Sequence, residues 1–548
     1  MVVVLASVSL LVGIRTKRPV VIVLAILVIV GGRSHREAER LRHSDPSGSL
    51  AGVARVVTDP EAGAFDVQGI ISVRGQRYVA SVPLGQSYEF STMLAGQSAR
   101  IEGRVRRLDG APEGWVLSNH LAGRIKLSSV RPDGTGGPWT RLANDLRRRV
   151  ADSANAMSSD ERALYLGLVV GDDRLQSELQ AYRFKASGLS HLLAVSGQNI
   201  AFVVMLAAPF TRRLSPRASL LVIIPILALF TVMTRAEPSV LRAVVMALIA
   251  LIATTASRRA AGIRVLALTV MLLLLIDPLV AHSIGFQLSV VATLGLIVIS
   301  EPLARRLPGP SWFSEPLAMT LAAQVATSPI IMGFNPSIAA VGPLANLLTV
   351  PLAGWVMMIG LTGGIVVGSL HPMIGVVTMY PIRWVLRWID SVAAVASRVP
   401  LAPLTPTKLS IVVGVIIGAV VLCDRGIVLG RNQRRILCIA TMAVVVVVLI
   451  PSRIPPGVHP LSEGAVLWRS PCGENVVAAS RNTKGVDLLV ALRELNVTSV
   501  EAVVTDGSAS ASSAAAFVDQ QYGRPQRHVG SGSTDDLVRR MESLVGSC

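Results

Sequence analysis

Charged and aromatic residues are scarce in this sequence of 548 residues. Only 16% of the residues are Asp, Glu, Lys or Arg, and only 4% are Phe, Trp or Tyr. Ordinary soluble domains carry about 25% charged residues, so this shortage excludes a wholly soluble protein of common type. Hydrophobic residues make up 51% of the chain, and the mean hydropathy is +0.57. Composition therefore predicts that much of the chain lies in a bilayer.

Cysteine is also scarce, and the motifs of familiar enzymes are missing. The sequence shows no P-loop, GxSxG, HExxH or CxxC signature. The four cysteines have no metal-like spacing and form no dense disulfide framework, namely Cys423, Cys438, Cys472 and Cys548. We therefore expect no enzyme activity, no catalytic residue, no metal and no cofactor. Energy for any transport would come from a separate motor or the proton gradient.

Basic residues outnumber acidic ones, 52 to 34, giving a formal net charge of +18. Such an excess fits either cytoplasmic membrane loops or a polyanionic partner. Charge alone does not separate these two interpretations, because every multi-pass membrane protein needs basic loops.

Shifts in composition divide the chain into five regions. Residues 1–32 are two apolar runs around the basic turn 15–18, which predicts a transmembrane hairpin rather than a cleavable signal peptide. Residues 33–137 alternate in hydrophobicity at 65–73, 76–82, 99–105 and 114–117, with turn signals between, which predicts an OB-like barrel of roughly five strands. Residues 138–186 read as a helical connector, with an N-cap signal at 158–161.

Residues 187–452 are almost entirely apolar and predict a transmembrane channel domain. The expected spans are 190–210, 217–234, 238–256, 262–280, 284–300, 315–335, 338–369, 374–397, 409–423 and 436–451. With the hairpin, the fold class is a polytopic α-helical membrane protein of about 12 spans. Residues 453–548 return to mixed composition and predict a small α/β module, with strands at 464–468, 475–479 and 500–504 and helices at 486–495 and 514–521.

Basic loops lie on one side of the expected membrane if 338–369 and 374–397 each cross once. By the positive-inside rule this side is the cytoplasm, which places both soluble regions outside it. The loops contain Arg15, Lys17, Arg18, Arg212, Arg213, Arg217, Arg258, Arg259, Arg264, Arg305, Arg306, Arg425, Arg431, Arg434 and Arg435. The expected location is the inner (cytoplasmic) membrane. Arg383, Arg387 and Asp390 give 374–397 an amphipathic or cavity-facing character.

Four ordered motifs resemble the ComEC family of DNA-internalisation channels. Residues 188–197 read G-L-S-H-L-L-A-V-S-G, and 238–246 read P-S-V-L-R-A-V-V-M. Asp277-Pro278 and G-F-Q-L-S at 285–289 follow, and then Q-V-A-T-S-P at 324–329 and N-L-L-T-V-P-L at 346–352. The resemblance implies an inner-membrane channel that passes single-stranded DNA into the cytoplasm during natural transformation. It also implies an extracytoplasmic DNA receptor and cytoplasmic motor or single-strand-binding proteins as partners.

Polar side chains within the spans are expensive in lipid and are the expected lining of a DNA path. The candidates are His191, Ser196, Gln198, Asn199, Arg235, Arg242, Gln287, Ser289, Gln324, Ser328 and Asn346. Arginines would meet phosphates, and amides would meet bases or sugars. The structural alternative for each is an interhelical hydrogen bond, or a local ion pair between Arg235 and Glu237.

The barrel is a second expected DNA contact, because OB-like barrels bind single strands through basic grooves and stacking aromatics. The candidates are Arg74, Arg77, Tyr78, Arg104 and Arg106, with Arg100 and Arg107 nearby. Acidic residues nearly balance the basic ones in this region, so the barrel is only weakly cationic overall.

The C-terminal module resembles the start of the metallo-β-lactamase-like domain found in many ComEC proteins. Residues 502–510 stand where those members have a strand followed by a histidine cluster, and Asp506 is alone there. A two-metal hydrolase needs that cluster, so we expect a truncated module without metal ligands or nuclease activity. The alternative function for the whole chain is transport of a small solute or lipid precursor, which would require midplane charged pairs or inverted repeats. A membrane-bound metallohydrolase is nearly excluded by the missing ligands.

Overall fold

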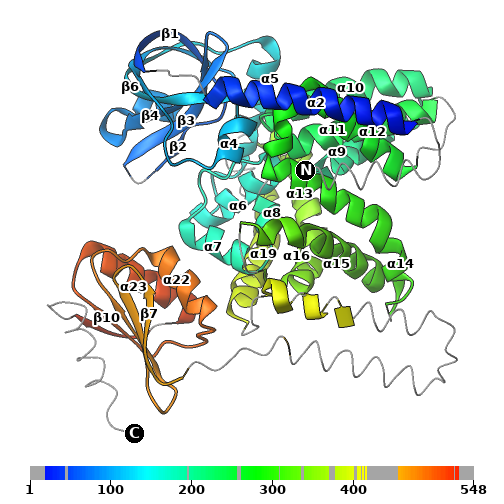
Figure 1. Ribbon diagram of the computed structural model, residues 1–548. Helices are drawn as coiled ribbons and strands as arrows, with labels where there is room; N and C mark the ends of the chain where they lie inside the picture. Colours follow the sequence, from blue (N-terminus) through cyan, green and yellow to red (C-terminus); the bar gives the residue numbers. More distant parts are fainter. Residues whose placement is uncertain are drawn as a thin grey trace, which may run out of the picture. The chain divides into compact units, whose positions relative to one another are not determined.

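The architecture comes from a computed structural model of the chain (Figure 1). The structure describes residues 19–42, 47–193, 197–255, 261–334, 338–369, 377–399 and 455–529, apart from residues 64, 308 and 524, together with isolated positions between 404 and 448. The first helix of the expected hairpin and most of the expected spans 409–423 and 436–451 lie outside these residues.

The chain forms two compact units. The first comprises residues 1–176, 191–330 and 350–387, and the second comprises residues 177–190, 331–349 and 388–548. The β-rich domain and most apolar helices belong to the first unit, and the C-terminal α/β module belongs to the second.

The β-rich domain is a ring of five strands: β1 (Gly48–Val56), β3 (Asp66–Val73), β4 (Gln76–Pro83), β5 (Ser98–Arg106) and β6 (Leu121–Gly134). The strand order is β1-β5-β6-β4-β3, and β1 also pairs with β3, so the sheet closes on itself (Figure 1). β4 and β6 run parallel, and the other pairs of the ring are antiparallel. The short β2 (Glu61–Ala62) adds to the edge of β3.

Alternating apolar side chains fill the inside of this barrel, as the period of two requires. Ile71, Tyr78, Ile101 and Ile125 are among the buried residues of its core. The strands predicted at 65–73, 76–82 and 99–105 are confirmed as β3, β4 and β5.

The strand predicted at 114–117 is wrong, because these residues belong to the helix α4 (Glu113–Ser118). Pro112 precedes the helix and Glu113 lies in its first turn, and both favour a helix start. Only Leu117 of this helix is buried, while Trp115 remains exposed. The last strand of the barrel is instead β6, which follows the helix.

Three helices follow the barrel: α5 (Pro138–Ser153), α6 (Ser159–Val170) and α7 (Glu178–Ala186). The N-cap signal at 158–161 is confirmed as a capping box. The Glu161 amide donates to the Ser158 hydroxyl, and the Ser158 amide donates to the Glu161 carboxylate. This reciprocal pair satisfies two amides that the helix start leaves free.

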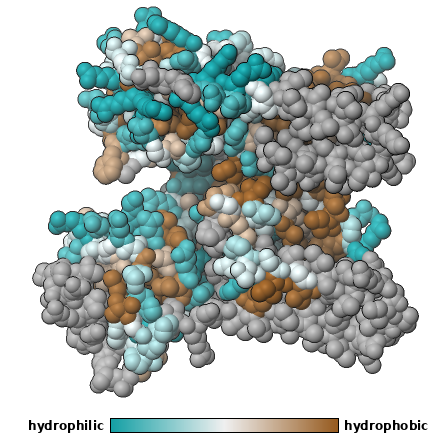
Figure 2. Space-filling model, viewed as in Figure 1, coloured by the Kyte–Doolittle hydropathy of each residue, from teal (hydrophilic) through white to brown (hydrophobic). Residues whose placement is uncertain are grey.

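Helices, most of them apolar, make up most of the rest of the first unit (Figure 1). They are α2 (Pro19–Arg42), α8 (Ser190–Leu193), α9 (Gly197–Thr211), α10 (Pro216–Met233), α11 (Pro238–Thr255), α12 (Gly262–Ile276), α13 (Ile284–Gly295), α14 (Glu301–Ala304), α15 (Ser311–Met332), α16 (Gly342–Ile359), α17 (Ile365–Val367) and α19 (Tyr380–Arg398). Four of these helices, α8, α15, α16 and α19, have residues in both units. Figure 2 shows hydrophobic side chains over the helices and mainly hydrophilic ones over the barrel.

Three helical stretches of the described chain are long and apolar enough to cross a membrane: Pro216–Met233, Ile284–Ala304 and Gly342–Val367. α9, α12 and Pro238–Ala253 are shorter apolar helices. The expected span 190–210 is divided between α8 and α9, and the expected span 262–280 ends early at Ile276. These apolar helices are those of a membrane protein, and the number of about 12 spans stays a prediction.

The C-terminal module is a five-stranded sheet with the order β11-β10-β9-β8-β7. Its elements are β7 (Gly457–Ser462), β8 (Ala465–Arg469), β9 (Asn475–Ala479), α22 (Gly485–Glu494), β10 (Ala502–Thr505), α23 (Ala509–Tyr522) and β11 (Gln526–Val529). β9, β10 and β11 are parallel, as expected where helices connect the strands. The three strands and two helices predicted here are confirmed, and β7 and β11 were not predicted.

Candidate functional site

Three of the resembling motifs meet around the guanidinium of Arg242 in α11. This side chain carries a positive charge, and yet it is buried among apolar helices. Its Nε donates to the Ser289 hydroxyl of α13 at 2.8 Å, and its Nη1 lies 2.9 Å from the Met246 sulfur. Arg242 comes from the 238–246 motif and Ser289 from the 285–289 motif.

The third motif contributes Gly197, the first residue of α9. A Cβ at this position would lie 2.7 Å from Nη2 of Arg242, so the absence of a side chain lets the guanidinium approach the helix start. Among the described residues, the recorded side-chain contacts of Arg242 are this hydroxyl and this sulfur, and none is a carboxylate. A buried cation without a carboxylate is costly, and such residues in membrane helices usually mark a functional path.

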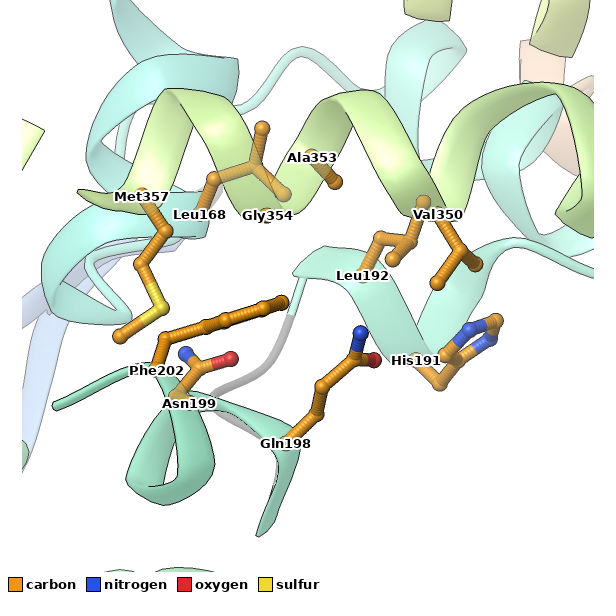
Figure 3. Close-up of a pocket in the computed structure, with 10 residues that line it drawn as sticks. All are labelled: Leu168, His191, Leu192, Gln198, Asn199, Phe202, Val350, Ala353, Gly354 and Met357. Atoms are coloured by element: carbon orange, nitrogen blue, oxygen red, sulfur yellow. The ribbon is translucent and has the colours of Figure 1, made fainter. Parts of the chain in front are cut away.

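A small pocket lies beside the same motif and holds three of the predicted path residues. His191 of α8 and Gln198 and Asn199 of α9 line it, together with apolar residues of α6, α9 and α16 (Figure 3). The Phe202 ring packs against Gly354, where a Cβ would lie only 2.5 Å from it. The pocket therefore joins one polar wall to one apolar wall.

The other predicted path residues do not join this pocket. The Gln287 amide donates to the Ala281 carbonyl at 2.8 Å, and the hydroxyl of Ser328 donates to the Gln324 carbonyl within its own helix. The side-chain oxygen of Asn346 is buried without a hydrogen-bond partner in the described part of the chain. Ser196 lies outside the described residues. The structure thus brings together His191, Gln198 and Asn199, and separately Arg242 and Ser289.

Arg235 lies in a buried ion network rather than on an open surface. Its Nε is 2.9 Å from Asp59, which sits between β1 and β2. Asp59 also binds Arg147 of α5, and Asp172 binds Arg174 at 2.6 Å. Burial alone raises the pKa of each aspartate, but the surrounding arginines outweigh it and hold both pKa values below the usual range. This network joins the barrel to the turn between α10 and α11.

Two carboxyl groups near this network, those of Glu61 and Glu237, have raised rather than lowered pKa values. Burial, followed by the charge of Asp173, raises the pKa of Glu61. Burial also raises the pKa of Glu237. Arg235 is thus not paired with its sequence neighbour Glu237. The structure pairs it with Asp59 and, at 3.7 Å, with Asp172. Sequence distance hid this partner, because Asp59 and Arg235 are far apart in the chain.

Basic residues face one another directly across β5 and β6 on the outside of the barrel. The aligned pairs are Arg104 with Lys126, Arg106 with Arg124 and Arg100 with Arg131, and all six are exposed. Like charges directly opposite one another destabilise a sheet. Arg100 is partly neutralised by Asp133 at 3.0 Å. We call these six residues the basic ladder; they are Arg100, Arg104, Arg106, Arg124, Lys126 and Arg131.

The remaining barrel candidates are divided by the fold. Arg74 is exposed in the turn after β3, and Arg77 is half-buried and donates to the Asn119 carbonyl at 3.4 Å. Tyr78 is buried in the barrel core, and its hydroxyl donates to the Gln76 amide oxygen at 2.6 Å. A stacking role for Tyr78 is therefore wrong, because its ring is not accessible to a base. Arg124, Lys126 and Arg131 were missed, although Arg124 and Lys126 alternate along β6 with the buried Ile125 and Leu127.

Asp506 of the C-terminal module lies just before α23, whose N-cap is Ser508. Its Oδ1 accepts from the Ser508 amide at 2.9 Å, and its Oδ2 accepts from the Arg481 amide at 2.8 Å. These bonds use the carboxylate for local structure. The module also contains a disulfide-bonded cysteine, Cys472.

Comparison with known proteins supports the resemblance drawn from the motifs. Residues 168–450 match the competence protein family. "ComE operon protein 3" of Bacillus subtilis (strain 168) is 26% identical over 292 residues, which cover 51% of this chain and 37% of that protein. The match thus spans little more than a third of that relative's length, and no solved structure matches the chain. Since the matched segment covers more than half of the sequence and contains every motif that converges on Arg242, the chain belongs to the competence protein family, of the ComEC type.

Proposed function

We propose that this protein is a multi-pass channel of the inner membrane that carries single-stranded DNA into the cytoplasm during natural transformation. Membership of the competence protein family supports a role in DNA uptake. The observation that carries the proposal is the buried guanidinium of Arg242, held by Ser289 where three motifs meet.

An arginine in this position suits a phosphate that passes along the helices. Guanidinium groups form strong, charge-assisted hydrogen bonds with phosphates. The hydroxyl of Ser289 and the thioether of Met246 orient Arg242 without neutralising it. Its positive charge is therefore available to a passing anion, whereas Arg235 is already ion-paired with Asp59.

The pocket beside this motif supplies groups that could contact bases or sugars. Amides donate and accept hydrogen bonds, and Gln198 and Asn199 present two of them on one wall. Contacts with bases are not required to be specific, because a channel for DNA must accept every sequence. His191 lies on the same wall, and a hydrogen-bonded structural role remains its alternative.

The barrel supports the proposal through its strand order and its basic ladder. The order β1-β3-β4-β6-β5, closed by β1 and with β4 parallel to β6, is consistent with an OB-like barrel. The repulsion within the basic ladder would be relieved by a phosphate backbone lying along it. We assign the ladder, rather than Tyr78, as the DNA-contacting part of the barrel.

The disulfide at Cys472 supports the orientation drawn from the basic loops. Disulfides persist in oxidising compartments outside the cytoplasm. The C-terminal module would therefore be extracytoplasmic, as the positive-inside rule predicts. We propose that the module has no nuclease activity, since the sequence after β10 lacks the histidine cluster of metal-binding members and Asp506 accepts hydrogen bonds from the Ser508 and Arg481 amides. An extracytoplasmic DNA receptor and a cytoplasmic motor or single-strand-binding protein are the proposed partners.

The test is uptake of labelled duplex DNA by a deletion strain complemented with variants of Arg242. Arg242→Gln keeps a donor for Ser289 but removes the charge, and Arg242→Lys keeps the charge. We expect Arg242→Gln to lower protected intracellular DNA at least tenfold and Arg242→Lys to retain more uptake, at equal protein levels.

Arg264→Gln is the matched control, because Arg264 is exposed at the start of α12. Equal uptake by Arg242→Gln and wild type would remove Arg242 from the path. Unchanged uptake in the deletion strain, while the strain remains transformable, would contradict the DNA channel itself. Transport of a small solute or lipid precursor would then be the better explanation.

A further inference from the structure

Glu37, His120 and Asp277 bring three potential metal-ligating groups together in the first unit. Glu37 lies on α2, His120 lies between α4 and β6, and Asp277 lies at the end of α12. One ligand atom from each residue lies within 4.8 Å of the others. Within the described part of the chain, these are the His, Cys, Asp or Glu residues that group in this way.

The distance between His120 and Asp277 fits two ligands of one ion. His120 Nε2 lies 2.9 Å from Asp277 Oδ2. Two ligands that each lie about 2.1 Å from an ion are ~3.0 Å apart at the right angle of an octahedral site and ~3.4 Å apart at the tetrahedral angle of zinc, so a small adjustment accommodates either. The same distance also fits a hydrogen bond, so this pair can exist before an ion enters.

A backbone contact orients the aspartate for this role. The Leu279 amide donates to Oδ1 of Asp277 at 2.9 Å, which leaves Oδ2 directed at His120. Such secondary hydrogen bonds are a regular feature of metal sites, because they fix the ligand before binding.

The three segments that carry the ligands also share one apolar cluster. Ala38 follows Glu37, Leu117 precedes His120 by three residues, and Leu279 follows Asp277 by two. These three apolar residues are buried together. The cluster holds the three ligand-bearing segments together, so little reorganisation would be needed when an ion binds.

We propose that Glu37, His120 and Asp277 bind a divalent transition-metal ion of the zinc or manganese class. One imidazole and two carboxylates suit these ions better than magnesium or calcium, which prefer oxygen ligands alone. Two negative charges balance a divalent cation. The side chains are 35%, 33% and 36% exposed, respectively, so an ion can enter from solvent and keep water at its remaining positions.

Such an ion would fasten α2, the barrel and the end of α12 to one another. This role differs from the nuclease chemistry of metal-dependent relatives, because it lies far along the sequence from the C-terminal module. It is also independent of the channel proposal, since it concerns binding by the purified chain.

The experiment is calorimetric titration of the purified full chain with Zn²⁺ after removal of metal, followed by thermal unfolding with and without Zn²⁺. We expect one ion per chain and a rise in Tm. Glu37→Gln, His120→Asn and Asp277→Asn should each weaken binding at least tenfold and abolish the rise in Tm. Titration with Mn²⁺ and Mg²⁺ ranks the ions, and tighter binding of Mg²⁺ would contradict the assigned class.

Matched controls come from the same helix as Glu37. His35 and Glu39 are exposed residues of α2 and do not belong to the group. His35→Asn and Glu39→Gln should bind Zn²⁺ as wild type does. Glu37→Gln is the mildest of the three changes, and it keeps the test valid if another variant does not fold. The proposal is overturned if wild type binds no Zn²⁺, or if a variant that carries all three changes binds it equally well.

Discussion

The barrel and the C-terminal module are attached to helices by different kinds of contact. The barrel meets the helices of the first unit through a buried ion network centred on Asp59. The module, in the second unit, meets α7 through an apolar core that includes Leu179 and Tyr182. Ion pairs thus dominate the contact between the barrel and the helices, which we call the ionic joint. Apolar burial dominates the contact between the module and α7, which we call the module joint.

The ion network at the barrel is nearly closed to water. The side chains of Asp59 and Arg147 are 1% and 4% exposed. Three arginines face two aspartates, with Arg235 and Arg174 as the other cations and Asp172 as the other anion. Buried ion pairs contribute little net stability compared with apolar packing, but breaking one is strongly destabilising. The network therefore fixes the position of the turn between α10 and α11 more than it strengthens the fold.

The module joint depends on apolar packing instead. Leu179, Tyr182 and Ala186 of α7 pack into the same buried cluster as Leu488 and Val503 of the module. The Tyr182 hydroxyl donates to the Leu489 carbonyl at 3.1 Å. Apolar burial is nondirectional and insensitive to moderate pH, so this joint should persist where the ionic joint fails. Along the chain, α7 leads into the 188–197 motif.

The largest effect is expected from Asp59→Asn, which leaves the buried arginines with one aspartate. Removing one partner of a buried ion pair costs about 3–5 kcal/mol. Thermal unfolding of the purified protein should show this loss. Asp133→Asn, which removes the exposed partner of Arg100, should cost only about 0–1 kcal/mol. Similar losses in the two variants would show that the network does not carry the barrel joint.

Acid should weaken the ionic joint selectively. The folded-state pKa values of Asp59 and Asp172 lie below the ordinary value of 3.8. Their contribution to stability is therefore present above pH 3.8 and is lost as the pH falls through the lower folded values. The Tm of wild type should drop below about pH 4, and that of Asp59→Asn should drop less. Parallel pH profiles of the two proteins would contradict this assignment.

The sequence predicted strands and helix starts better than it predicted which distant residues contact one another. The strands β3, β4 and β5 follow from alternation, and the start of α6 follows from the Ser158 and Glu161 signal. The run 114–117 is too short to show a period, and the helix signals at Pro112 and Glu113 decided its structure.

The convergence of Arg242 and Ser289 was predicted only as membership of a common path. Both residues lie in motifs, so they could be identified as candidates, but their contact depends on how α11 packs against α13. The partners of Asp59 and Asp277 and the pairing within the basic ladder could not be predicted for the same reason. Their partners are brought close by strand register and helix packing, neither of which a single sequence specifies.

The smallest effect is expected from Tyr182→Phe, which tests whether the module joint depends on its hydrogen bond or on its apolar core. The change leaves the ring in place and removes the donor to Leu489, so it should cost about 1 kcal/mol.

Burial raises the pKa of Tyr182 to about 12. Its contribution is therefore present below pH 10.0 and is lost as the pH rises through about 12, and Tyr182→Phe should lessen this alkaline loss. Burial also raises the pKa of Tyr165 in the first unit to about 12. Tyr165→Phe is therefore the matched comparison, and it should lessen the alkaline loss of stability in the same way. If Tyr182→Phe instead destabilised the protein as much as Asp59→Asn does, the module joint would depend on a polar contact, and the contrast with the barrel would fail.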